Sequence, residues 1–146
     1  MNTRTFALVW GILFLLIAGS GFVPGLLQPP GAGHPDMAVD ILYGDALGLF
    51  PVNVIHSVLH LLYGLWGIAA SRSWSGARAY AKVVAISYGL LTVLGLIPGI
   101  NTLFGLVPIF GHDVWLHLVL ALPAFYFGFM RRDAEAERTN TAGTSY

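Results

Sequence analysis

Four long apolar runs constrain the fold of this chain more than any other feature. They cover residues 6–27, 52–70, 80–100 and 114–130, and none has a charged residue at its centre. A helix needs about 20 apolar residues to cross a bilayer core of about 30 Å. Because lipid offers the backbone no hydrogen bonds, continuous runs of this length are predicted to be helices. The sequence therefore predicts an all-α, polytopic membrane protein with a bundle of four transmembrane helices.

The composition supports lipid as the solvent. Charged residues make up 10% of the chain, against about a quarter in soluble domains. Zero net charge without a basic patch argues against a nucleic-acid partner, and the lack of cysteine excludes disulfides and thiolate metal sites. The first apolar run extends through Val23, which is longer than the core of a signal peptide, so we expect it to be retained.

The distribution of cationic residues predicts the topology. With four spans, every lysine and arginine falls on the side of the two termini, namely Arg4, Arg72, Arg78, Lys82, Arg131, Arg132 and Arg138. The positive-inside rule then places both termini in the cytoplasm. We expect a four-span membrane domain over residues 1–132 and a polar cytoplasmic tail over 133–146. In the first outer loop, residues 36–49 are compatible with a short interfacial helix.

An internal repeat relates the two halves of the chain. Residues 47–61 align without gaps on residues 104–118, and the alignment pairs Pro51 with Pro108 and His60 with His117. The matched prolines and histidines favour two duplicated helical hairpins. An even number of spans per unit implies parallel repeats. His60 and His117 would then occupy equivalent positions on the second and fourth helices.

Two strings carry a family resemblance. FPVNVIHSVLHLLYGLWG and HDVWLHLVLAL resemble an uncharacterised bacterial membrane family, domain of unknown function 4383, and the resemblance covers residues 6–130. It implies a four-helix membrane protein, and we expect the bacterial inner membrane as its location. It implies no activity and assigns no functional residues.

Polar residues recur at helical spacing near the outer ends of the second and fourth spans. Asn53, His56 and His60 are three and four residues apart, and Asp113 and His117 are four apart. Such spacing places each set on one helix face. Polar side chains within spans usually face the bundle interior and are candidate functional groups. His34 and His112 fall in loops, where we expect them to be solvated.

A structural role for this polar cluster is the first of three interpretations. Asn53 and Asp113 would cap the second and fourth helices, and the histidines would hydrogen-bond between helices. The protein would then be a non-enzymatic scaffold, or an accessory subunit of a larger membrane complex or homo-oligomer. We expect no enzyme, because the sequence has no phosphate loop, catalytic carboxylate pair or nucleophile elbow.

Ligand binding and transport are the other two interpretations. His60 and His117 would ligate haem iron, the magnesium of a pigment, or a zinc or copper ion together with Asp113 or His112. His56 and His60 can also chelate one metal from a single helix face. Alternatively, histidine and aspartate at one membrane face would handle protons or ions in an oligomeric transporter. The sequence leaves all three interpretations open.

Overall fold

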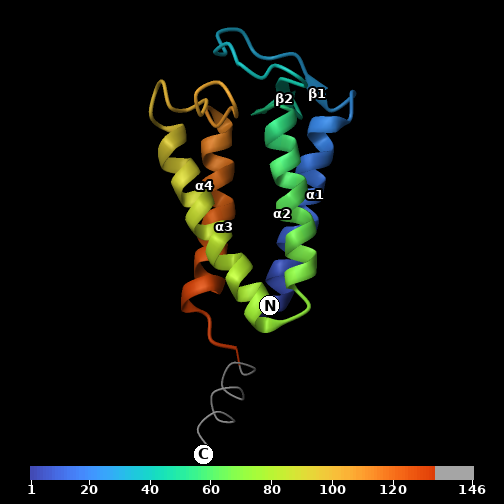
Figure 1. Ribbon diagram of the computed structural model, residues 1–146, viewed down its shortest axis with the longest axis vertical. Helices are drawn as coiled ribbons and strands as arrows, with labels where there is room; N and C mark the ends of the chain where they lie inside the picture. Colours follow the sequence, from blue (N-terminus) through green and yellow to red (C-terminus); the bar gives the residue numbers. More distant parts are fainter. Residues whose placement is uncertain (134–146) are drawn as a thin grey trace, which may run out of the picture.

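The computed structural model describes residues 1–133 and is mainly helical (Figure 1). Its elements, in chain order, are α1 (Thr3–Phe22), β1 (Leu27–Gln28), β2 (Gly44–Ala46), β3 (Phe50–Val52), α2 (Val54–Ala70), α3 (Trp74–Gly95), α4 (His112–Phe125) and the π-helix η1 (Tyr126–Met130). The predicted four-helix architecture is confirmed. Nearly all of the predicted tail, with Arg138, lies outside the described residues.

The helices are arranged as two pairs. α1 packs along α2, and α3 packs along α4, while α3 also contacts α1 and α2 (Figure 1). The two helices of each pair follow one another in the sequence, as expected for helical hairpins. The duplication of one hairpin into two stays a prediction.

The outer surface of the bundle is apolar and its polar side chains lie inside. α1, α3 and the continuous segment His112–Met130 are each long and apolar enough to cross a membrane. α2 is an apolar helix of 17 residues, which corresponds to about 25 Å. Leu16 and Leu96 are about two-thirds exposed, whereas His60 and His117 are buried. An exposed surface of this kind is suited to lipid and indicates membrane localisation.

Helix boundaries differ from the predicted spans where capping residues set them. α1 begins at Thr3 because the Asn2 side chain accepts a hydrogen bond from the Thr5 backbone N–H. α3 begins six residues before position 80, because Ser73 caps it through the Gly76 N–H. Hydropathy misses these first turns because they lie outside the apolar run.

The first outer loop is not an interfacial helix, so this expectation was wrong. Instead it contributes to a three-stranded antiparallel sheet in the order β1–β2–β3, which lies over the ends of α1 and α2 that are opposite the N-terminus (Figure 1). Leu47 and Gly48 both have positive φ and form the tight turn between β2 and β3. A right-handed helix cannot include two such residues, and a Cβ at Gly44 would collide with the Gln28 carbonyl of β1.

Glycines bring α1 and α2 into close contact. A Cβ at Gly11 would lie 2.7 Å from the Ile68 backbone nitrogen and 2.9 Å from the Gly64 carbonyl oxygen. A Cβ at Gly67 would lie 2.8 Å from the Gly11 Cα atom. Small residues at such positions allow the backbones of membrane helices to approach. This contact fixes α2, and hence its histidines, relative to α1.

Candidate metal centre

Asn53 positions the start of α2. Its Oδ1 accepts a hydrogen bond from the His56 backbone N–H at 3.0 Å, which confirms the predicted cap. Its Nδ2 donates to the carbonyl oxygens of Val39 and Leu106, at 2.9 and 2.8 Å. Val39 belongs to the segment between β1 and β2, and Leu106 to the segment between α3 and α4. One buried amide therefore ties the helix that carries two histidines to both segments.

Three histidines converge just inside this cap. His56 and His60 are one turn apart on α2, and their rings stack with centroids 4.6 Å apart. His117 reaches in from α4, with its ring centroid 5.8 Å from that of His56. Each ring offers a ligand atom such that all three atoms lie within 4.8 Å of one another. The predicted meeting of His60 and His117 in the bundle interior is thus seen, with His56 as a third member.

Asp113 lies beside the imidazoles. Its Oδ2 is 3.4 Å from Nδ1 of His117 and 3.8 Å from Nε2 of His56. The expectation that Asp113 caps α4 was wrong, because the N-cap is Gly111 and makes no side-chain cap bond. Since α4 begins at His112, Asp113 sits within the first turn and its carboxylate is completely buried beside the histidines.

Aromatic side chains of the other two helices enclose the cluster. Phe14 of α1 stacks against His60 at a centroid distance of 5.7 Å. Tyr88 of α3 meets the His117 ring edge-on at 5.0 Å. Each of the four helices therefore contributes a wall. Sequence reasoning missed Phe14, because nothing in an apolar helix marks which of its phenylalanines will contact a polar site.

Most buried polar atoms of the cluster lack hydrogen bonds within the described residues. Within residues 1–133, this holds for both ring nitrogens of His60 and His117, Nδ1 of His56 and both carboxylate oxygens of Asp113. A buried polar group left unpaired costs about 1–3 kcal/mol. Several such groups therefore converge on one point without hydrogen bonds from the described residues.

The donor set suits a divalent transition-metal ion. Neutral imidazole and carboxylate are ligands for zinc and for neighbouring metals, and catalytic zinc sites often have three protein ligands. Zinc–nitrogen bonds of about 2.0–2.1 Å place tetrahedral nitrogen ligands roughly 3.4 Å apart. Ligand atoms within 4.8 Å of one another can reach that spacing by small side-chain rotations.

The two loop histidines lie outside this cluster. His112 is exposed at the start of α4. His34 is more enclosed than expected, with Nδ1 3.6 Å from Asp45 Oδ1 and its ring edge-on to Phe110. The ring contact with Phe110 joins the segment between β1 and β2 to the segment between α3 and α4.

An apolar helical bundle with a buried cluster of histidines and one aspartate defines a small membrane-type protein with a candidate ligand site. The chain belongs to the family described as Domain of unknown function (DUF4383), whose model matches residues 4–130. Comparison with curated proteins gives no match, and comparison with solved structures gives none either.

Proposed function

We propose that this protein binds one divalent transition-metal ion inside the membrane through His56, His60 and His117. The observation that carries the proposal is the convergence of three buried imidazoles whose ligand atoms lie within 4.8 Å of one another. Zinc is the reference case, because its tetrahedral preference accepts three imidazoles and one further ligand.

Asp113 is proposed to orient His117 and to balance charge. Metal-bound histidines commonly donate their other ring N–H to a carboxylate, which fixes the tautomer. The Asp113 oxygen faces Nδ1 of His117, which leaves Nε2 as the metal ligand. One carboxylate also offsets half of the ion's charge, and this matters because desolvating an unbalanced charge is costly.

We prefer metal binding to a purely structural role. Structural histidines would hydrogen-bond between helices, whereas neither ring nitrogen of His60 makes a hydrogen bond within the described residues, and His117 Nδ1 lies 3.4 Å from Asp113 Oδ2 of its own helix. The scaffold or accessory-subunit role stays a prediction. A bare ion is favoured over haem because three rings converge directly, with Phe14 and Tyr88 packed against them.

The packing beneath the cluster argues against ion transport. Between the histidines and the end near the N-terminus, the core is filled by buried apolar and aromatic side chains, among them Phe6, Phe14 and Val84. A hydrated ion would need a polar path through this layer. Binding at one level of the membrane therefore fits the core better than passage across it.

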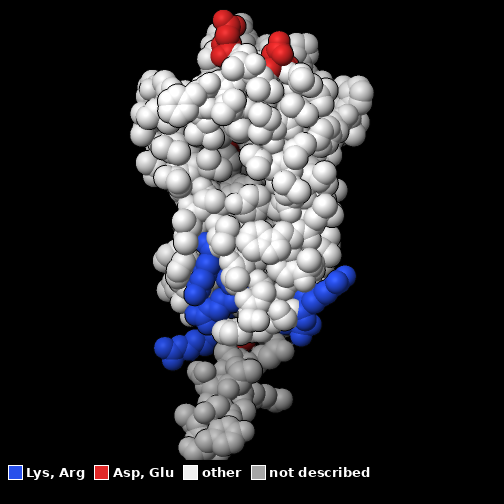
Figure 2. Space-filling view, in the orientation of Figure 1, with Lys and Arg blue, Asp and Glu red and all other residues white. Residues whose placement is uncertain are grey.

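The orientation is part of the proposal. Lysine and arginine side chains gather toward the end of the bundle that carries the N-terminus, and the most prominent acidic side chains in view lie at the opposite end (Figure 2). By the positive-inside rule, four spans would then leave both termini in the cytoplasm and the metal centre near the outer surface. The lipid bilayer is the expected surrounding, and a bacterial inner membrane the expected location.

Metal analysis of the purified full-length protein tests this function. Protein stripped with a chelator and reloaded with Zn²⁺ should retain about one ion per chain after desalting. Co²⁺ loading should give the visible absorption bands of a tetrahedral site. The triple variant of His56, His60 and His117 to alanine should lose both signals, while His34→Ala and His112→Ala should keep them. Equal loading of the folded triple variant would overturn the proposal.

A further inference from the structure

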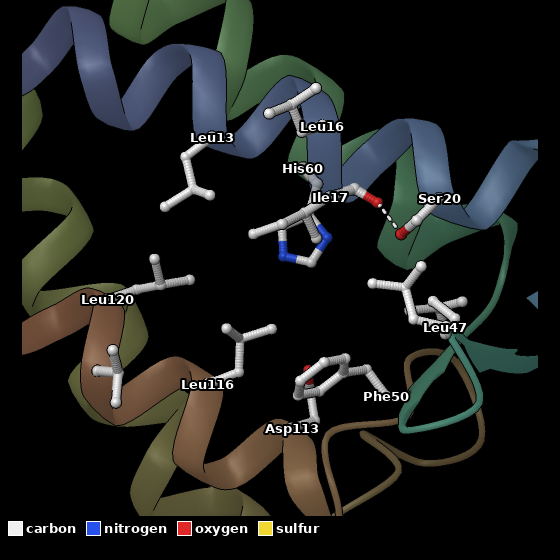
Figure 3. Close-up of a pocket in the computed structure, with 13 residues that line it drawn as sticks. Leu13, Leu16, Ile17, Ser20, Leu47, Phe50, His60, Asp113, Leu116 and Leu120 are labelled. Carbon is white, nitrogen blue, oxygen red and sulfur yellow. Dashed lines mark hydrogen bonds between the residues drawn. The ribbon is translucent and has the colours of Figure 1, made fainter. Parts of the chain in front are cut away.

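A second feature of the molecule is an apolar cavity of about 310 Å³ between α1 and α4. Leu13 and Ile17 of α1 form one wall, and Leu116 and Leu120 of α4 form the other (Figure 3). The turn between β2 and β3 closes the outer end through Leu47. At the other end of the cleft, Trp10 Nε1 donates a hydrogen bond to the Leu120 carbonyl oxygen at 3.2 Å and joins the two helices.

The cavity opens toward the lipid-facing side of the bundle. Leu16 of α1 and Val119 of α4 border it, and they are 68% and 61% exposed on the outer surface. Side chains that both line a cavity and face outward mark its mouth. A molecule dissolved in the bilayer core can therefore enter sideways between these helices without passing through water.

Two buried titratable side chains lie against the deep wall of this otherwise apolar cavity. His60 and Asp113 are its buried titratable lining residues, and His60 lies centrally among the apolar side chains (Figure 3). Neither side chain has a hydrogen bond within the described part of the chain. Apolar walls with a few convergent polar groups are the usual pattern of a small-molecule site.

Charge and size restrict the occupant. Asp113 is the acidic residue of the lining, and the described lining residues include no lysine or arginine. An anionic head group would therefore find no cation and would face a carboxylate. A volume near the lower limit of ligand pockets, about 300 Å³, accommodates a ring or a short chain rather than a whole phospholipid. A neutral hydroxyl fits both polar groups, because it can donate to Asp113 while it accepts from a ring N–H of His60.

We propose that this cavity binds a neutral, lipid-soluble molecule with a single hydroxyl head, which enters between α1 and α4 and places its oxygen between His60 and Asp113. The inference goes beyond metal binding and does not require it.

Photolabelling in nanodiscs tests the proposal with full-length protein. The probe is a 4-alkylphenol that carries a diazirine on its alkyl chain. We expect it to label peptides of α1 around Leu13 and of α4 around Leu116. Excess 4-pentylphenol should reduce this labelling, whereas pentylbenzene, which lacks the hydroxyl, should not at equal membrane concentration. Equal competition by the two compounds would overturn the role of the two polar side chains.

A matched pair of substitutions on α4 separates the cavity from the outer surface. Val119→Trp should fill the mouth and reduce labelling about tenfold, a loss of roughly 1.4 kcal/mol in binding. Leu122 is equally exposed but does not line the cavity, so Leu122→Trp should label like the wild type. Undiminished labelling of folded Val119→Trp would refute the site.

Metal loading of the same samples keeps the two proposals distinguishable. Labelling that persists in protein unable to hold Zn²⁺ would support the cavity and reject the metal centre. Zn²⁺ held at one ion per chain without site-specific labelling would do the reverse.

Discussion

Oδ2 of Asp113 lies 3.4 Å from Nδ1 of His117, one turn further along α4, and both side chains are completely buried. This pair places a carboxylate behind one histidine of the cluster, on the ring nitrogen opposite the one available to a ligand. Its geometry allows the metal proposal to be tested without removing any proposed ligand.

Asp113→Asn should weaken metal binding without abolishing it. The amide keeps the shape of the side chain but removes the charge that orients His117, and loss of such a partner typically lowers metal affinity 10–100-fold. Competition against a coloured chelator measures the affinity. Asp36→Asn, in an exposed part of the first outer loop, serves as the control. An unchanged affinity in Asp113→Asn would mean that the carboxylate does not act on the centre.

His60→Leu should have opposite effects on metal-free and metal-loaded protein. Without metal, an unpaired buried imidazole is replaced by an apolar side chain, which should raise stability by about 1–3 kcal/mol. With metal, the wild type should gain stability that the variant lacks. Thermal unfolding with and without Zn²⁺ measures both effects. A marked loss of stability in the metal-free variant would instead indicate a structural role for His60.

Asn53→Ala should destabilise the outer end of the bundle by roughly 2–4 kcal/mol, from loss of a helix cap and two side-chain hydrogen bonds. Asn53→Asp keeps the capping oxygen but loses the donors to Val39 and Leu106, so it should lie between alanine and the wild type. Hydrogen exchange in α2 and in the two loops distinguishes the effects. If both variants match the wild type, Asn53 does not hold these segments together.

Gly11→Ala should loosen the contact between α1 and α2. The added methyl group would press against backbone atoms of α2, which cannot move aside as a side chain can, at a cost of about 1–3 kcal/mol. Gly19→Ala is the matched control on the same helix, because its methyl group would meet nothing within 4 Å. Thermal unfolding in mild detergent should show a lower midpoint for Gly11→Ala alone.

Asp133 should make the N-terminal end of the bundle sensitive to acid. Its Oδ2 accepts a hydrogen bond from the Thr3 backbone N–H at 2.9 Å, and Arg131 Nε donates to Oδ1 at 3.0 Å. Burial raises the pKa of Asp133, but the bonds from Thr3 and Arg131 outweigh it, so the pKa lies below its usual value. The stabilisation is therefore complete above the unfolded pKa of about 4 and is lost as pH falls through the lower folded pKa.

Amide exchange at Thr3 reports this acid sensitivity. Its protection factor should decrease as pH falls below about 4 in the wild type, and it should be low and independent of pH in Asp133→Asn. Equal protection in both proteins at neutral pH would show that the contact does not stabilise the start of α1.

Much of the fold and part of the site were predictable because they depend on local sequence. Apolar runs of membrane length predict helices wherever lipid is the solvent. The spacing of Asn53, His56 and His60 places them on one face of α2, and the position of Asn53 before the helix predicts its cap. The first outer loop was mispredicted because its strands are two or three residues long, and such segments are too short for an alternating pattern.

The sequence by itself determined which residues share a helix face, since that follows from 3.6 residues per turn. Only the tertiary structure decided how far those faces lie from one another. The Gly11 contact with α2, the Asn53 bonds to two loops and the start of α4 at His112 together bring three histidines and Asp113 to one point. The same packing leaves the cavity between α1 and α4, because α1 packs mainly on α2 and α4 on α3. Such distances depend on contacts between residues far apart in the chain, and local periodicity carries no information about them.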